Sequence, residues 1–182
     1  MSICVILGGA ISVWRELHEA ERLIGGRPYI VGAVNDSGAV YPGRLDFWAT
    51  LHPGKMPVWR AARRGLVGDD GGRGYSHIGG IGDGVHEIVP RWGGPSGSSG
   101  LYAVQIATER RGATRVILCG VPMDERPNVH RVEAEWRQAE GYRAAWVRAA
   151  DRDEFRAAVR SMSGWTAALL GQPSDEWLGD GA

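Results

Sequence analysis

Residues 93–123 read GGPSGSSGLYAVQIATERRGATRVILCGVPM, and this stretch decides the fold class of the chain. It passes from a loop of glycine and serine into a largely apolar helix, predicted from about Ser99 to Arg111. A short buried strand at Arg115–Cys119 follows and ends at a sharp turn. A glycine and serine loop that opens a helix presents free backbone N–H groups at the positive end of the helix dipole. The stretch therefore predicts a site for phosphate or another anion.

Three further apolar runs have the composition of buried parallel strands. They are residues 2–7 (SICVIL), 29–34 (YIVGAV) and 45–51 (LDFWATL). The first two are separated by an amphipathic helix predicted at about 12–24, which Gly25-Gly26 would end. Strands that alternate with helices imply a mainly parallel sheet with helices on both faces. We therefore predict a Rossmann-like α/β fold.

A glycine-rich segment at 65–97 interrupts this alternation. Apolar residues are interspersed in it, which favours irregular but ordered structure over a disordered linker. We expect one or two short strands, near 75–78 and 86–89, and we place the segment at the ligand-facing rim of the sheet.

Two helices are expected near the end of the chain, at about 132–149 and after Asp151. Asp151 and Glu154 have the spacing of a capping box. The second helix would continue through Met162. The buried residues expected on this cover are Trp136, Trp146, Phe155, Ala158, Val159 and Met162.

The length of 182 residues suits one sizeable core, so we predict a single domain at 1–170 and a polar tail at 171–182, with Trp177 able to anchor it. The formal net charge is zero, which argues against a duplex nucleic-acid binder. Cys4 and Cys119 fall in predicted buried strands and are expected to act as small hydrophobes. No membrane-spanning or signal-like run occurs, so we expect a soluble cytoplasmic protein without a membrane partner, and a homo-oligomer is left open.

Ligands of such sheets bind beyond the carboxyl ends of the strands. The candidate ligand-binding residues are those that follow the predicted strands or start the apolar helix. They are Gly8, Gly9, Asn35, Asp36, Gly97, Ser98, Ser99, Gly100 and Met123.

Each candidate has a structural alternative. Gly8-Gly9 suits either close approach of a ligand or a tight strand-to-helix turn, and it is neither a full GxGxxG nor a Walker A loop. Asn35-Asp36 could hydrogen-bond a nucleoside or form an Asx turn. The serines at 98 and 99 could hold phosphate or simply cap the helix.

Candidates for catalysis are His52 and Asp36. His52 ends a strand at the predicted site, which suits a general base. Asp36 could bind Mg²⁺ together with Asp124 through carboxylate oxygens, and whether the protein uses a metal stays open.

Several short segments together carry a family resemblance. They are the strand ending in Gly8-Gly9, Ala33-Val34-Asn35-Asp36, Asp46-Phe47-Trp48-Ala49-Thr50, Ser98-Ser99-Gly100-Leu101-Tyr102-Ala103, Gly112-Ala113 and Val116 to Met123. Over roughly residues 3–123 the chain resembles a Rossmann-like group. That group includes 6-hydroxymethylpterin diphosphokinase-like proteins, sialyltransferase-like glycosyltransferases and small uncharacterised phage and prophage proteins.

The resemblance implies a nucleotide or nucleotide-sugar held by the first glycine turn, Asn35-Asp36 and the Ser98-Ser99 loop. Two features depart from the group. The first turn reads Gly8-Gly9-Ala10-Ile11-Ser12 where Gly-Pro-Ser is common, and no acceptor-binding subdomain is evident.

Three functions therefore compete. The first is a nucleotide-dependent glycosyl or pyrophosphoryl transferase, with His52 as its base. The second is a non-catalytic protein that binds or sequesters a nucleotide, as a phage accessory factor would. The third is a structural or interaction protein that retains only the fold.

Overall fold

The computed structural model describes residues 1–79, 84–92, 98–129 and 138–179. Its centre is a seven-stranded sheet in the order β5-β4-β3-β2-β1-β6-β7, and every pair of neighbouring strands is parallel. The strands are β1 (Ile3–Leu7), β2 (Tyr29–Val34), β3 (Phe47–Thr50), β4 (Arg73–Ser76), β5 (Glu87–Ile88), β6 (Arg115–Cys119) and β7 (Val159–Ser161). The predicted α/β fold with a parallel sheet is confirmed.

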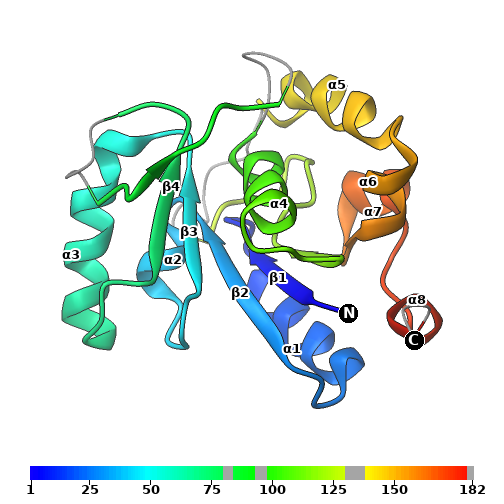
Figure 1. Cartoon of the computed structure of the whole chain (residues 1–182), viewed down its shortest axis with the longest axis horizontal. Helices are drawn as coiled ribbons and strands as arrows, with labels where there is room; N and C mark the ends of the chain where they lie inside the picture. The colour runs from blue at the N-terminus through cyan, green and yellow to red at the C-terminus, as the bar shows by residue number, and fades with distance from the viewer. Residues whose placement is uncertain (80–83, 93–97, 130–137, 180–182) are drawn as a thin grey trace.

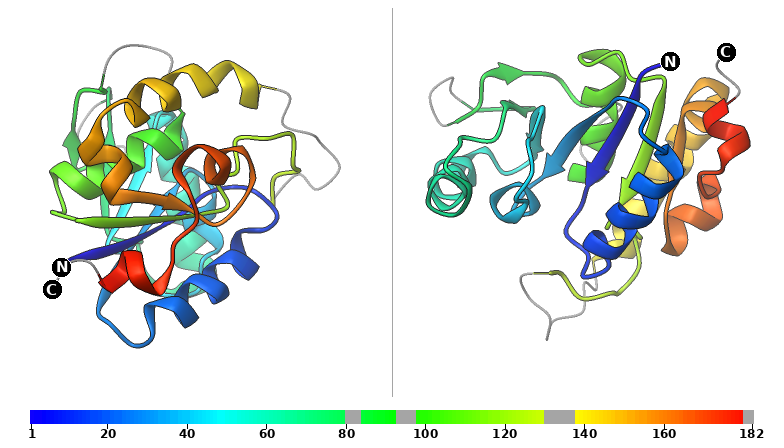
Figure 2. Two further views of the ribbon diagram at one scale, coloured as in Figure 1. Left: turned by 90° about the vertical axis from the view of Figure 1, so that its right-hand side faces the viewer. Right: turned by 90° about the horizontal axis from the view of Figure 1, so that it is seen from below.

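Helices cover both faces of this sheet (Figures 1 and 2). One face packs against α1 (Val13–Ile24), α2 (Ser37–Val40), α3 (Met56–Val67) and α8 (Asp175–Gly179). A short 3-10 turn at Pro53–Lys55 precedes α3. The other face packs against α4 (Ser99–Glu109), α5 (Ala139–Ala150), α6 (Asp153–Ala158) and α7 (Gly164–Leu170).

Helix α4 is the most enclosed helix in the described chain. Every residue from Ser99 to Ala107 is buried, as its nearly uniform apolar sequence predicts. The sheet lies on one side of α4, and the aromatic side chains of α5 and α6 lie on the other. Trp146 is fully buried and meets the edge of Phe155 with ring centroids 6.4 Å apart. Because α4 is held between two layers, the position of its first turn is fixed by the core.

The central strands lie close to where the sequence predicts them. β1, β2 and β6 agree within a residue, and the strand expected at 45–51 is shortened to Phe47–Thr50. The glycine-rich segment supplies β4 and β5, which extend the sheet beyond β3. These are the two short strands expected near 75–78 and 86–89, found within two residues of the expected bounds.

The C-terminal region differs most from the sequence prediction. The helix after Asp151 ends at Ala158, and Val159 and Ser161 pair with Val116 and Leu118 of β6 as a parallel edge strand. The open edge of β6 offers hydrogen bonds that outweigh the local helical pattern.

One smaller prediction for this region also needs correction. Asp151 is the C-terminal cap of α5 and not part of a capping box, since α6 begins at Asp153 with Arg152 before it. The expected anchoring of the tail by Trp177 is confirmed, since the tail contains α8, whose Trp177 is buried and donates its indole N–H to the Ala157 carbonyl at 2.8 Å. Trp136 and residues 132–137 of the expected helix lie outside the described residues.

We predict that Phe155→Ala lowers the free energy of unfolding by about 3–5 kcal/mol, because it removes a buried ring that packs on both Trp92 and Trp146. Urea denaturation followed by tryptophan fluorescence would measure the change. Val58→Ala is the matched control, since the Val58 side chain on α3 is 70% exposed. Equal midpoints for Phe155→Ala and wild type would show that α6 does not contribute to the core.

Candidate functional site

The predicted site residues within the described part of the chain gather at the carboxyl edge of the sheet and at the start of α4. Parallel strands place their carboxyl ends at one edge, which is where α/β sheets bind ligands. The residues found there are Gly8, Gly9, Asn35, Asp36, His52, Ser98, Ser99, Gly100 and Met123. Gly97 lies outside the described residues.

A chain of hydrogen bonds connects three of these residues around the end of β3. The Thr50 hydroxyl donates to Asn35 Oδ1 at 2.8 Å and accepts from the His52 backbone N–H at 2.8 Å. One residue before His52, the Leu51 N–H donates to Ser99 Oγ at 3.4 Å. Asn35, His52 and Ser99 therefore surround one strand end, at the place where the first turn of α4 meets the sheet.

Asn35 holds the turn after β2 in a conformation that few residue types adopt readily. Its φ is +53°, in the left-handed region that asparagine tolerates better than most side chains. The carbonyl of Asn35 accepts the indole N–H of Trp48 at 2.6 Å. Together with the bond from Thr50, this contact fixes both the backbone and the amide of Asn35 at the edge.

The two serines at the start of α4 have different roles. Ser98 is the helix cap, and its Oγ accepts from the Leu101 N–H at 3.3 Å and from the Trp146 indole N–H at 3.1 Å. Ser99 occupies the first helical position, where backbone N–H groups have no acceptor within the helix. The capping alternative therefore accounts for Ser98, and the amides of Ser99 and Gly100 remain the ones suited to an anion.

The first glycine turn packs against the chain itself. The N–H groups of Gly8 and Ala10 donate to the carbonyls of Cys119 and Gly120 at 2.7 and 3.0 Å. A Cβ at position 8 would lie only 2.2 Å from the Gly120 carbonyl oxygen, so the approach requires glycine. Close packing of β1 against the exit of β6 is thus a sufficient reason for Gly8.

Gly9 lies beside Asp36 and a segment that crosses the first turn. A Cβ at position 9 would be 2.5 Å from Asn128 Nδ2 and 3.8 Å from Asp36 Oδ1. Ala10 and Asn128 form an antiparallel bridge, and the Val129 N–H donates to the Gly9 carbonyl at 2.8 Å. Asn128 therefore occupies part of the space between the first turn and Asp36.

Met123 contributes to the edge through its backbone. Its side chain is buried in the core on the α4 face, and its φ of +52° turns the chain sharply after β6. The Met123 carbonyl accepts the Arg143 Nε–H at 3.0 Å. This contact ties the loop after β6 to α5.

His77, predicted to lie inside a strand, adds a second imidazole to this edge. His77 is the first residue after β4, as His52 is the second after β3, and the centroid of the His77 ring lies 6.4 Å from that of the Tyr102 ring on α4. The Nδ1 atom of His77 is buried and has no hydrogen-bond partner in the part of the chain that the structure describes. Had the strand expected at 75–78 been predicted to end two residues earlier, at Ser76, His77 would have joined the list of strand-end candidates.

Both imidazoles are disposed to be neutral. Burial lowers the pKa of His52, and the positive charge of Lys55 lowers it further. Burial also lowers the pKa of His77, with smaller contributions from Arg91 and from His52 itself. A neutral imidazole can accept a proton, so either side chain has the ionisation state that a general base needs.

Glu16, on the inner face of α1, forms a buried polar centre beside the exit of β6. Its carboxylate accepts the Gly120 N–H at 2.7 Å and the Ser163 hydroxyl at 2.5 Å. Arg126 also donates to Ser163 at 2.7 Å and forms an ion pair with Asp124 at 3.1 Å. In the sequence, Glu16 lies at helical spacing from the apolar residues Val13 and Ala20. An acidic residue on the face of a helix that is predicted to be buried is the signal by which Glu16 could have been found.

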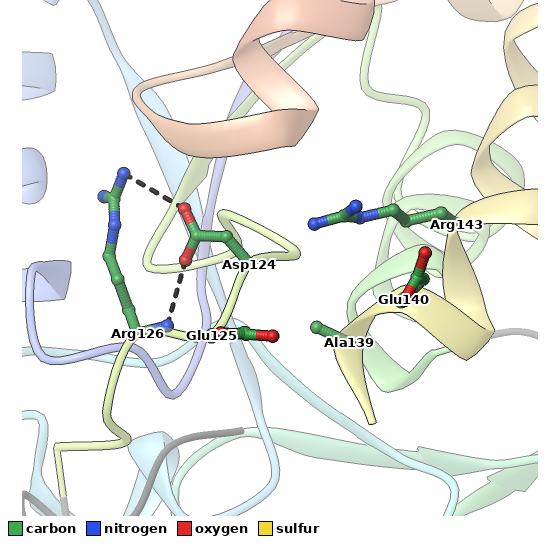
Figure 3. A pocket seen from close by; sticks show the side chains of 6 residues that line it. All are labelled: Asp124, Glu125, Arg126, Ala139, Glu140 and Arg143. Atoms are coloured by element: carbon green, nitrogen blue, oxygen red, sulfur yellow. Dashed lines mark hydrogen bonds and ion pairs between the residues drawn. The ribbon is translucent and has the colours of Figure 1, made fainter. Parts of the chain in front are cut away.

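A cavity of about 420 Å³ opens next to this polar centre, between the loop after β6 and the start of α5 (Figure 3). Its lining is charged and mixed in sign. The lining residues are Asp124, Glu125, Arg126, Ala139, Glu140 and Arg143.

Asp36 and Asp124, the two carboxylates suggested as Mg²⁺ ligands, have different surroundings. Asp124 is already neutralised by Arg126, whose guanidinium and backbone N–H both contact its carboxylate. Asp36 lies beside Gly9 and Asn128. Among the described residues, no three or more His, Cys, Asp or Glu side chains are grouped so that they could hold a metal ion.

No protein-family model, curated protein or solved structure matches this chain. In the described ranges, every helix is too short or too polar to span a bilayer.

We predict that Glu16→Ala lowers the free energy of unfolding by about 1–3 kcal/mol, because it leaves the buried Gly120 N–H without its acceptor. Chemical denaturation would measure the loss. Glu19→Ala on the same helix is the control, since the Glu19 side chain is 48% exposed and forms only a long ion pair with Arg15. Similar effects of the two substitutions would contradict a structural role for the Glu16 carboxylate.

Proposed function

We propose that this protein binds a nucleotide or nucleotide-sugar at the carboxyl edge of β2, β3 and β4, with the phosphate against the first turn of α4. The observation that carries the proposal is the meeting of that first turn with the end of β3, where Asn35, His52 and Ser99 are joined through Thr50 and Leu51.

The phosphate position follows from the helix itself. The amides of Ser99 and Gly100 lack acceptors within α4, and the positive end of the helix dipole favours negative charge there. Helix α4 is locked by its buried faces, so these donors are fixed in place before a ligand arrives. Such preorganisation reduces the entropic cost of binding.

The nucleoside side of the ligand would lie toward the ends of β2 and β3. Asn35 and Asp36 follow β2 and carry amide and carboxylate groups suited to a ribose or a base. The crevice at β1 and β6 is less suitable, because the N–H groups of Gly8 and Ala10 are bonded within the protein and Asn128 lies over Gly9. The proposed site is therefore displaced from the first turn toward β3.

We expect UDP, with and without Mg²⁺, to raise the melting midpoint of the wild-type protein, since a ligand that binds only the folded state stabilises it. Ser99→Asp should abolish this increase because it places negative charge at the phosphate position. Its unliganded midpoint should fall somewhat, since the carboxylate enters a buried position, so the quantity compared is the increase that UDP produces in each protein.

Ser174→Asp is the matched control for this experiment. Ser174 precedes α8 and its Oγ accepts from the Trp177 N–H at 3.1 Å, so the substitution also adds an acid at a helix start, away from α4. Ser174→Asp should keep the response to UDP. Equal responses of wild type and Ser99→Asp would place the nucleotide elsewhere.

Transfer of the glycosyl or pyrophosphoryl group is the second candidate function, favoured by the neutral imidazole of His52 at the same edge. His52 would take the proton from the attacking hydroxyl, while binding alone would need no base. A protein that only sequesters the nucleotide would keep the same binding residues.

Release of UDP from UDP-glucose would test this second candidate across a range of pH. If His52 is the base, turnover should persist as the pH falls below the ordinary histidine value of 6.5, because the lowered pKa keeps the imidazole neutral there. His52→Ala should lose turnover but retain UDP binding, while His18→Ala, an exposed histidine on α1, should retain both. Binding without turnover in the wild type would favour the sequestering protein.

A further inference from the structure

The cavity between the loop after β6 and α5 is separate from the proposed nucleotide site, and different residues form it. Its charged side chains come from the loop at 124–126 and from the first turns of α5. In Figure 3 the Arg143 guanidinium extends from α5 across the opening toward Asp124, and the Glu125 carboxylate points toward Ala139.

Arg143 is held in place from two directions. Its Nε–H donates to the Met123 carbonyl at 3.0 Å, and its guanidinium lies over the Trp165 ring at 5.2 Å. The described residues offer no acceptor to its two Nη groups. A guanidinium that is fixed through Nε and a ring face, with both Nη groups unpaired among the described residues, is preorganised to bind a carboxylate with two parallel hydrogen bonds.

The cavity is lined by charges of both signs from both the loop and the helix. The loop supplies Asp124, Glu125 and Arg126, and α5 supplies Glu140 and Arg143. Arg126 forms ion pairs with Asp124 at 3.1 Å and with Glu16 at 3.8 Å, so its charge is already shared between two carboxylates. Glu125 and Glu140 are exposed, and neither has an ion-pair partner within the described residues. A ligand with a single charge would satisfy either Arg143 or these two carboxylates, and not both.

We propose that this cavity binds a small zwitterion of the amino-acid type, with its carboxylate on Arg143 and its ammonium group facing Glu125 and Glu140. A volume of about 420 Å³ accommodates a molecule of this size. The proposal does not depend on the proposed nucleotide function, because no residue is shared between the two sites.

Three probes that differ only in charge test the proposal. L-Alanine carries both charges, N-acetyl-L-alanine carries only the carboxylate, and L-alaninamide carries only the ammonium group. Each would be titrated into the ¹⁵N-labelled full-length protein and followed by NMR. L-Alanine should shift the amide signals of residues 124–126 and 139–143 and bind at least about tenfold more tightly than either blocked form, since each charge-assisted contact contributes about that factor.

Variants then assign the two ends of the ligand. Arg143→Gln should abolish binding of L-alanine, while Arg15→Gln on the exposed face of α1 should not change it. Arg143 also contacts Met123, so Glu125→Gln/Glu140→Gln, at two exposed positions, provides a test that does not depend on a core contact. It should weaken L-alanine about tenfold and leave N-acetyl-L-alanine unchanged or tighter. Equal binding of L-alanine and N-acetyl-L-alanine, or no shifts at the cavity with L-alanine, would overturn the proposal.

Discussion

The carboxyl edge of this protein depends on the close approach of two backbone segments, at Gly8 and Gly120. The hydrogen bonds between β1 and β6 continue past the ends of the strands, through the N–H groups of Gly8 and Ala10. The Glu16 carboxylate on α1 accepts a hydrogen bond from the Gly120 N–H. No side chain fits between the segments, because a Cβ on Gly8 would collide with the Gly120 carbonyl. The path of the loop after β6, and with it the cavity beside α5, follows from this constraint.

A second constraint is the complete burial of α4 between the sheet and the outer helices. The Ser98 hydroxyl joins the two layers, since it caps α4 and also accepts the indole N–H of Trp146 from α5. Packing in the outer layer therefore sets the position of the α4 amides relative to His52 and Asn35. The same layer of helices includes α5, which carries Arg143. The two proposed binding sites therefore both depend on the packing of the outer helices against α4.

Much of the architecture could be predicted from the sequence because its signals are local. The apolar runs at 3–7, 29–34 and 115–119 have the length and composition of buried parallel strands, and the helix between the first two repeats its apolar residues at helical spacing. Parallel strands then force their carboxyl ends to one edge, which is why Asn35, His52 and Ser99 could be placed near one another without a structure.

The tertiary structure alone decided the features that depend on distant partners. Val159–Ser161 forms a strand because β6 has an open edge, although its own sequence continues a helical pattern. Ser98 and Ser99 look alike in sequence, and the structure distinguishes them: Ser98 caps α4 and accepts the Trp146 indole N–H, whereas Ser99 accepts the Leu51 N–H at the end of β3. The mixed charges of the cavity come together because Met123 turns the chain toward Arg143 on α5. Local pattern thus determined the elements and their order, whereas contacts between residues far apart in the chain determined which side chains face a ligand.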